Sequence, residues 1–150
     1  MSRAVEKNDW CITTGEDWRE VFIVGDPTLE FVENPAFDPD CTDTPNNPKF
    51  IPQPKDLSGY DVKMDIREGE VVTDTIIQGL RIPTEITIGN PLPLDGTVEL
   101  FLTAAKTKAA AFISNIDEDV FFDLFLIPPS GDNVKLLFGK IKIIGATTDV

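Results

Sequence analysis

One segment, residues 60–67, constrains the fold of this chain more than any other, because its apolar and charged residues alternate without a break. The apolar members are Tyr60, Val62, Met64 and Ile66, and the charged members are Asp61, Lys63, Asp65 and Arg67. A period of two places each set on one face of a β-strand. A helix would mix the two sets around its circumference. The segment therefore predicts a strand with one buried face and one solvent-facing face.

Segments rich in β-branched, aromatic and alternating residues recur over most of the chain, with turn residues between them. We expect strands at residues 18–24, 60–67, 71–77, 97–102, 120–127 and 134–144. Residues 67–70 and 128–133 are typical of hairpin turns. Apolar residues at positions 80, 82, 86 and 88 predict one more strand, in which Pro83 indicates a sheet edge or a bulge. Seven or eight strands with turns this frequent predict an all-β fold, either a sandwich or a small barrel.

Residues 103–113 depart from the strand pattern because they are rich in alanine. Thr103 is a suitable N-cap, and Ser114 with Asn115 provides a stop signal. Position 106 is lysine, so no capping box supports the start of this helix. We expect one short helix here that crosses between two strands.

Proline is concentrated in one part of the chain. Seven of the twelve prolines lie between residues 27 and 54, and this density excludes a helix or a central strand. We therefore interpret residues 26–55 as an extended, Pro-rich excursion from a single domain that spans residues 1–150. Loops of this length in compact domains are functional arms or disordered segments. Apolar anchors within it, Phe31, Phe37, Phe50 and Ile51, favour packing onto the domain or onto a neighbour.

Composition limits the classes of function. The chain has 13 basic and 26 acidic residues, a formal net charge of −13, and such a field repels phosphate backbones. We therefore expect no nucleic-acid partner. Histidine is absent, which removes the commonest general base and metal ligand. A hydrophobic fraction of 41% with ten phenylalanines is sufficient for a core, so the chain is not a disordered acidic tail.

The N-terminus and the cysteines bear on the compartment. Residues 1–9 are polar, no secretory signal follows them, and no apolar window is long enough to span a membrane. We expect synthesis in a cytoplasm without export and no membrane partner. Cys11 and Cys41 permit one disulfide, and a reducing compartment favours two free thiols. Cysteine spacing of the zinc type is missing, so we expect no zinc site.

Two acidic groups are candidates for chemistry. Asp38, Asp40 and Asp43 could hold Ca²⁺ through oxygen ligands, but an EF-hand glycine and closing glutamate are missing, and a solvated acidic loop is favoured. Residues 117–119 form an acidic cluster that could in principle do acid–base work, although a charged turn is favoured. Nucleophile, P-loop and dinucleotide motifs are absent. We therefore predict no enzyme, no cofactor and no metal.

Aromatic and basic residues suggest contact surfaces. Trp10 and Trp18 flank the first turn, where core or interface packing is a commoner use of tryptophan than stacking on sugars. Phe121 and Phe122 must point to opposite faces of a sheet, so one of them lies outside the core. Lysines 135, 140 and 142 predict a solvated strand face that also blunts edge pairing. The candidate interface residues are Trp10, Trp18, Phe31, Phe37, Phe50 and Ile51.

Four segments together resemble a family of small tailed-phage virion proteins. They are Gly15-Glu16-Asp17-Trp18, residues 56–67, residues 96–113 with Leu100-Phe101-Leu102-Thr103-Ala104-Ala105 and Thr107, and residues 122–141 with Phe122-Asp123-Leu124, Pro129-Ser130-Gly131 and Leu136-Leu137-Phe138-Gly139-Lys140-Ile141. The resemblance covers residues 10–30 and 56–149. Within these residues, the chain is similar to the N-terminal domain of phage baseplate upper proteins. The excursion is longer than the usual link in that family. Baseplate upper proteins carry a long C-terminal stalk, and we expect none in this protein.

The resemblance implies an immunoglobulin-like β-sandwich and a non-enzymatic virion structural role. We expect an adaptor in the tail, neck or baseplate that joins other virion proteins and copies of itself, after assembly in the host cytoplasm. Its contacts would use the excursion, the N-terminal segment and sheet edges. Capsid decoration is one alternative. A carbohydrate-binding β-sandwich that uses Trp10, Trp18 or Tyr60, with Ca²⁺ on the acidic loop, is an alternative of another class, and a hydrolase using Asp117 and Asp119 is the least favoured.

Overall fold

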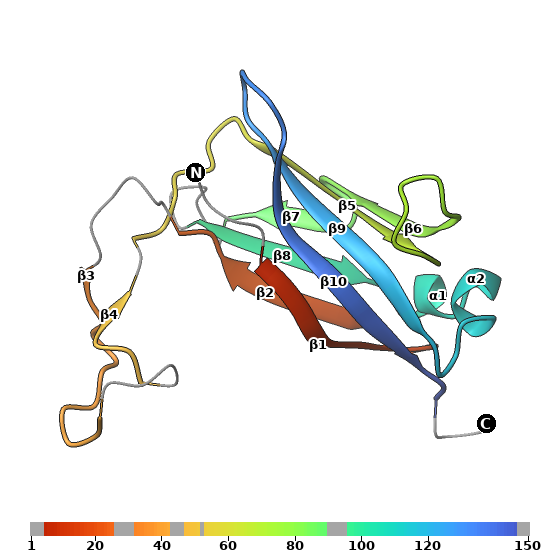
Figure 1. The fold of residues 1–150 in the computed structure, drawn as a ribbon, viewed down its shortest axis with the longest axis horizontal. Coiled ribbons are helices and arrows are strands. Elements are labelled where there is room, and N and C mark those ends of the chain that lie inside the picture. The colour runs from red at the N-terminus through yellow and green to blue at the C-terminus, as the bar shows by residue number, and fades with distance from the viewer. Residues whose placement is uncertain (1–4, 26–31, 43–46, 52, 90–95, 147–150) are drawn as a thin grey trace.

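A computed structural model describes residues 5–25, 32–42, 47–51, 53–89 and 96–146, and its regular structure is mostly β-strand (Figure 1). The strands are β1 (Val5–Thr13), β2 (Trp18–Ile23), β3 (Val32–Glu33), β4 (Phe50–Ile51), β5 (Asp61–Arg67), β6 (Ile76–Arg81), β7 (Ile86–Ile88), β8 (Thr97–Leu102), β9 (Asp119–Ile127) and β10 (Val134–Ile144). Two helices, α1 (Ala104–Thr107) and α2 (Ala110–Ile113), lie between β8 and β9. The all-β prediction is confirmed.

The larger sheet has five strands in the order β1-β10-β9-β5-β6. Strand β1 runs parallel to β10, and the other neighbours are antiparallel. Residues along β9 alternate between buried and partly exposed, as a period of two requires. Phe122 is buried and Phe121 is partly exposed, so the prediction that they face opposite sides is confirmed.

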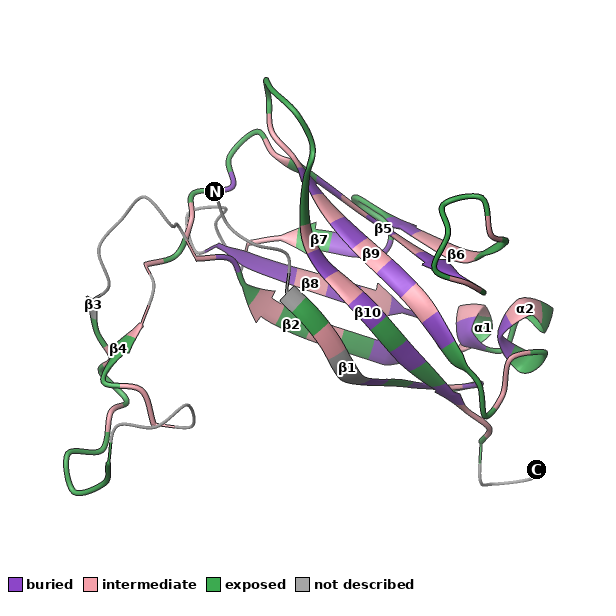
Figure 2. Ribbon diagram, in the orientation of Figure 1, coloured by how far each residue is buried: buried purple, intermediate pink, exposed green. Residues whose placement is uncertain are grey.

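The smaller sheet has the order β2-β8-β7, with both outer strands antiparallel to β8. Buried side chains from both sheets belong to one hydrophobic cluster, which identifies the space between the sheets as the core (Figure 2). Trp10 of β1 lies at the junction: its ring stacks on Phe122, with centroids 5.0 Å apart, and meets the ring of Trp18 edge-on at 5.9 Å. These aromatic contacts tie β1, β2 and β9 together.

The predicted strand at residues 71–77 is wrong. Residues 68–75 form a loop that the backbone closes, because the Glu68 N–H donates to the Thr75 carbonyl at 2.9 Å. The Val71 N–H donates to the Asp74 carboxylate at 2.8 Å, which takes it out of any strand ladder. Val72 is 74% exposed. The strand begins instead at Ile76 and continues through Gly79.

A single strand across positions 80–88 is also wrong. Arg81 ends β6, and a turn that contains Pro83 carries the chain into β7 of the other sheet. Glu85 fixes this turn, because its carboxylate accepts from the Arg81 N–H at 2.9 Å while its own N–H donates to the Arg81 carbonyl at 2.9 Å. Pro83 therefore lies in a connection between sheets and not on a sheet edge or at a bulge.

Strand β1 is absent from the sequence-based expectation. Its first half is polar, but β10 supplies a partner that is more than 130 residues away in the chain. The register shifts between Lys7 and Trp10, which marks a bulge. From Val5 onward, the N-terminal segment is thus part of the larger sheet.

The predicted helix at residues 103–113 is divided into α1 and α2. Thr103 is the N-cap of α1, and its hydroxyl accepts from the Lys106 N–H, as expected. Ala109, with ψ of 152°, separates the two helices. No helix among the described residues is long and apolar enough to cross a membrane.

The excursion leaves the two-sheet body at one place (Figure 1). At its base, Gly25 pairs with Pro54 as an isolated β-bridge, and the Lys55 N–H donates to the Val24 carbonyl at 2.8 Å. The Val24 N–H in turn donates to the Gly96 carbonyl at 2.7 Å, which joins this base to the smaller sheet. Farther out, β3 and β4 form a short antiparallel pair. We call residues 26–53 the arm.

Candidate contact surfaces

The arm has its own hydrogen-bonded framework, separate from the core. The Asn34 side-chain amide donates to the Pro48 carbonyl at 2.8 Å, and the Asn34 N–H donates to the Lys49 carbonyl at 2.8 Å. Asn47 accepts from the Asp38 N–H at 2.9 Å and donates back to the Asp38 carbonyl at 3.2 Å. Asparagine amides thus supply the hydrogen bonds that proline nitrogens cannot.

Three of the predicted contact residues lie on the described part of the arm. Phe50 is 48% exposed, with the Lys49 ammonium 5.9 Å from its ring centroid. Phe37 and Ile51 are partly exposed. Phe31 lies outside the described residues. The arm therefore presents apolar side chains far from the hydrophobic core, where a neighbouring molecule can reach them.

Trp10 and Trp18 have a different environment. Their side chains belong to the core, and the residues are only 7% and 5% exposed. Neither indole ring offers a surface on which a sugar or a partner could stack. Their contribution is to the packing of the body, so the candidate contact residues that the structure describes as reachable are Phe37, Phe50 and Ile51.

In the acidic loop, the Asp38 carboxylate stabilises the local backbone. One Asp38 oxygen accepts from the Asp40 N–H at 3.0 Å and the other accepts from the Cys41 thiol at 3.3 Å, an arrangement that stabilises a turn. Asp43 lies outside the described residues. Within the described ranges, no group of three histidine, cysteine, aspartate or glutamate side chains is placed to bind a metal. Cys11 and Cys41 are both exposed free thiols.

The acidic cluster at residues 117–119 lies in the turn that enters β9. Asp117 has a φ of 68° and its N–H donates to the Ile143 carbonyl at 2.7 Å. The Glu118 carbonyl accepts from the Ile143 N–H at 3.1 Å. These bonds hold the turn against β10, and the three acids line neither of the hollows described below.

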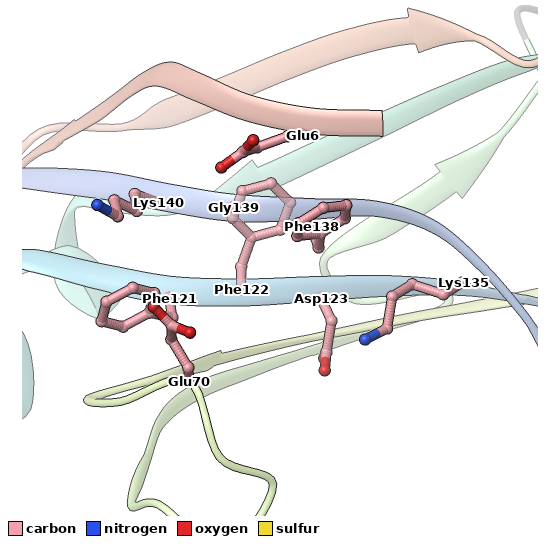
Figure 3. A pocket seen from close by; sticks show the side chains of 9 residues that line it. All are labelled: Glu6, Glu70, Phe121, Phe122, Asp123, Lys135, Phe138, Gly139 and Lys140. Carbon is pink, nitrogen blue, oxygen red and sulfur yellow. The ribbon is translucent and has the colours of Figure 1, made fainter. Parts of the chain in front are cut away.

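A hollow of about 250 Å³ lies over the outer face of the larger sheet (Figure 3). Gly139 lines it together with Phe121 and Phe138, while Glu6 reaches in from β1 and Glu70 from the loop after β5. Its lining residues are Glu6, Glu70, Phe121, Phe122, Asp123, Lys135, Phe138, Gly139 and Lys140. Aromatic walls with a rim of both charges suit the hollow to binding a side chain of a partner.

Charges on this outer face are paired across strands. Asp65 and Asp123 are direct neighbours in the β5–β9 register, and Arg67 lies between them with a nitrogen 3.2 Å from each carboxylate. Arg81 adds a second contact to Asp65 at 3.0 Å. A buried guanidinium thus neutralises two carboxylates that would otherwise repel each other.

Aromatic rings on the same face are flanked by lysines. The Lys63 and Lys135 ammonium groups each lie 5.7 Å from the Phe125 ring centroid, and that of Lys140 lies 5.9 Å from the ring of Phe121. Their lysine–aromatic contacts cover rings that a sheet face would otherwise expose. The face on which solvated lysines are expected therefore also carries phenylalanine rings, which lysine side chains cover.

A second hollow, of about 340 Å³, lies beside the turn that contains Pro83 and is lined mostly by apolar residues. Tyr60 contributes to it, with the Lys55 ammonium 5.4 Å from its ring centroid. Nearby, the Ser58 hydroxyl donates to the Asp56 carboxylate at 2.6 Å, and this bond, followed by the one from the Ser58 N–H, lowers the pKa of Asp56 below its ordinary value of 3.8.

Comparison of the sequence with protein-family models and with curated proteins gave no match.

Proposed function

We propose that this protein is a non-enzymatic structural protein of a tailed-phage virion, an immunoglobulin-like adaptor in the tail, neck or baseplate. The observation that carries the proposal is the arm. It leaves the body at the Gly25–Pro54 bridge, contains its own hydrogen-bonded framework, and exposes Phe50. A contact element of this kind reaches a neighbour without disturbing the core of the domain that bears it.

Charge supports the same use of the arm. Between residues 26 and 50 there are six acids and one lysine, a net charge of −5. A basic groove on a neighbouring virion protein is the complementary surface, and such complementarity mainly accelerates and orients association. The whole chain carries −13, which favours a position on the outside of a particle or tail, away from packaged DNA.

Contacts between two of the phage-like segments add support. The Asp17 carboxylate accepts from the Ala104 N–H at 2.7 Å, and the Gly15 N–H donates to the Thr107 hydroxyl at 3.0 Å. The segment at residues 15–18 thus contacts the segment at residues 96–113. The contact gives a physical reason for the two segments to occur together in one sequence.

The test is mass spectrometry of purified particles of the phage whose genome encodes the chain. We expect its peptides at a fixed ratio to those of tail or baseplate proteins. Absence from the particle would contradict the proposal. A ratio set by the number of capsid subunits would instead assign it to capsid decoration.

Binding to carbohydrate is tested separately with a glycan array in the presence and absence of Ca²⁺. Because both tryptophans are buried, we expect no signal. A glycan-specific, Ca²⁺-dependent signal would contradict the adaptor role in favour of a recognition module.

Phe50→Glu, compared with Val72→Glu on the exposed loop of the body, is expected to reduce incorporation into particles, because only Phe50 lies on the arm.

A further inference from the structure

Among the residues that the structure describes, β1, β6, β2 and β7 lie at the edges of the two larger sheets, and they differ in how well each is protected. A register shift interrupts β1 between Lys7 and Trp10, and another interrupts the pairing of β6 with β5. Strand β7 has only three residues. By contrast, β2 pairs over six residues with no shift. Bulges and short length are the usual protections of an edge, and β2 has neither.

The hydrogen-bonding groups on the open side of β2 follow from its register. The Val24 N–H donates to the Gly96 carbonyl at 2.7 Å, and this pair continues the register in which Phe22 faces Val98 and Glu20 faces Leu100. Hydrogen-bonded pairs recur at every second residue of an antiparallel ladder. Even-numbered residues therefore bond to β8, and the main-chain groups of Arg19, Val21 and Ile23 point away from the sheet.

The side chains of these odd-numbered residues are also unusual for an edge. Val21 is 52% exposed and Ile23 is 63% exposed. The Arg19 guanidinium is drawn toward β8, because it lies 3.1 Å from Glu99 and 4.9 Å from the ring centroid of Phe101. The open edge thus carries two exposed aliphatic side chains and no lysine or proline. Its two charged residues are Arg19, which is turned toward β8, and Glu20, which is partly buried.

We propose that β2 pairs antiparallel with β2 of a second copy of this chain, about a two-fold axis at Val21. The pairing joins the two three-stranded sheets into one continuous sheet. It uses the outward-pointing main-chain groups of Arg19, Val21 and Ile23 from each copy. A two-fold interface of this type is self-complementary, because the same strand serves both partners.

The choice of a second copy rests on the sequence of the strand. With the axis at Val21, Val21 faces its own counterpart, and Arg19 of each copy faces Ile23 of the other. Glu20 then faces Phe22. No like charges oppose each other, whereas a shift of the axis by one residue to Glu20 would place two carboxylates directly opposite, which is destabilising. The strand is thus matched to itself in one register.

The proposed adaptor function includes contact with other copies of this chain. The pairing of β2 specifies how two copies would meet, and in that sense it rests on the proposed function. The two have separate readouts. Particle incorporation tests the adaptor function through the arm. Self-association of the purified chain tests β2, and it involves no phage protein.

The test is sedimentation velocity of the purified full chain over a range of concentrations. We expect a reversible species of twice the chain mass of 16.6 kDa. Val21→Lys places two ammonium groups at the axis and is expected to weaken dimerisation by at least about tenfold. Val72→Lys, at an exposed valine outside β2, is the control and is expected to leave dimerisation unchanged. A monomer at all concentrations, or equal dimerisation of both variants, overturns the proposal.

A cross-link tests the register. In a background with Cys11→Ser and Cys41→Ser, Val21→Cys is expected to form a disulfide-linked dimer on mild oxidation, because residues opposite each other in a hydrogen-bonded pair have Cα atoms about 5.5 Å apart. Phe22→Cys, whose counterpart would be Glu20, is expected to form far less. Thermal unfolding by circular dichroism confirms that each variant folds. Equal cross-linking at both positions overturns the axis at Val21.

Discussion

At the scale of single residues, one buried hydroxyl connects distant parts of the chain. Thr107 is fully buried, accepts from the Gly15 N–H at 3.0 Å and donates to the Glu16 carbonyl at 2.7 Å. It also approaches the Ala104 carbonyl of its own helix at 3.2 Å. A small polar side chain at the end of α1 therefore holds the turn between β1 and β2, and its bonds are the reason that this turn and this helix meet.

Replacing Thr107 with valine keeps the shape of the side chain and removes both bonds to the turn. We expect a loss of about 1–2 kcal/mol in the free energy of unfolding, because two backbone groups lose their partner. Urea denaturation measures it. Thr87→Val on β7, where the threonine is exposed, is the matched control and should change stability little. Equal effects of the two substitutions would refute the role of Thr107.

The Ser58 hydroxyl is the largest cause of the lowered pKa of Asp56. Ser58→Ala should raise that pKa toward its ordinary value, with part of the shift retained through the Ser58 N–H. A lowered pKa in the folded state gives stability that is present above the unfolded pKa and lost as pH falls through the folded one. Removal of the hydroxyl should therefore reduce the pH dependence of stability in acid. An NMR titration of the Asp56 carboxyl in both proteins measures the shift, and an unchanged pKa would contradict the assignment.

At the scale of elements, the position of β1 depends on a close approach to β10. A Cβ added at Gly139 would lie 2.0 Å from the Lys7 carbonyl oxygen. The backbone of one of the two strands would have to move to relieve this overlap. Gly139 pairs with Lys7 on one side and Phe122 on the other. Glycine at this position therefore allows β1 to approach β10 closely enough to pair with it.

Gly139→Ala should displace the start of β1 and reduce stability by about 1–3 kcal/mol, the usual range for overpacking a close contact. Hydrogen exchange of β1 amides should accelerate more than that of β9. Gly79→Ala on β6 is the control, since its added Cβ would meet only side-chain atoms at 3.3 Å or more. Unchanged hydrogen exchange of the β1 amides would show that the close approach of Gly139 to Lys7 does not determine the position of β1.

Elements with strong local patterns could be predicted from the sequence, and those set by distant partners could not. Strands β8 and β10 have the expected bounds because alternation and turn residues define both of their ends. Strand β1 was missed because its first residues are polar and its pairing comes from β10. Residues 71–77 have strand propensity, but Asp74 binds the backbone of their first part into a loop, and the strand begins only at Ile76.

The contact surfaces could be predicted only in part, for a similar reason. Proline density located the excursion, and its base closes within one residue of the expected limits. Composition could not show which aromatic residues face outward, so Trp10 and Trp18 stood beside Phe50 among the candidates. The hollow over Gly139 requires the register of three strands, and no pattern within one segment contains that information.

At the scale of the whole molecule, backbone contacts at the base join the body to the arm. The Gly25–Pro54 bridge and the Lys55 N–H bond to Val24 connect the two strands of the base. We expect that replacing residues 28–52 by a short Gly-Ser turn leaves the melting temperature within a few degrees, because shortening a loop has a small, favourable entropic effect.

Differential scanning calorimetry of the full chain and of the shortened chain measures this. A broad transition in the shortened chain, without the cooperativity of the full one, would show that the arm contributes to folding and would contradict the independence of the two parts. If the transition stays sharp, the same shortened chain becomes the reagent for testing contact with neighbours, since it differs from the full chain only in the arm.

The closed base of the arm also affects how such a protein can change over generations. Insertions, deletions and exchanges of sequence between residues 26 and 53 alter reach and charge while the residues that pack the core stay in place. Relatives of this chain should therefore differ in length mainly at this point. A lineage that meets a new neighbour can replace the segment that touches it and keep the rest of the protein.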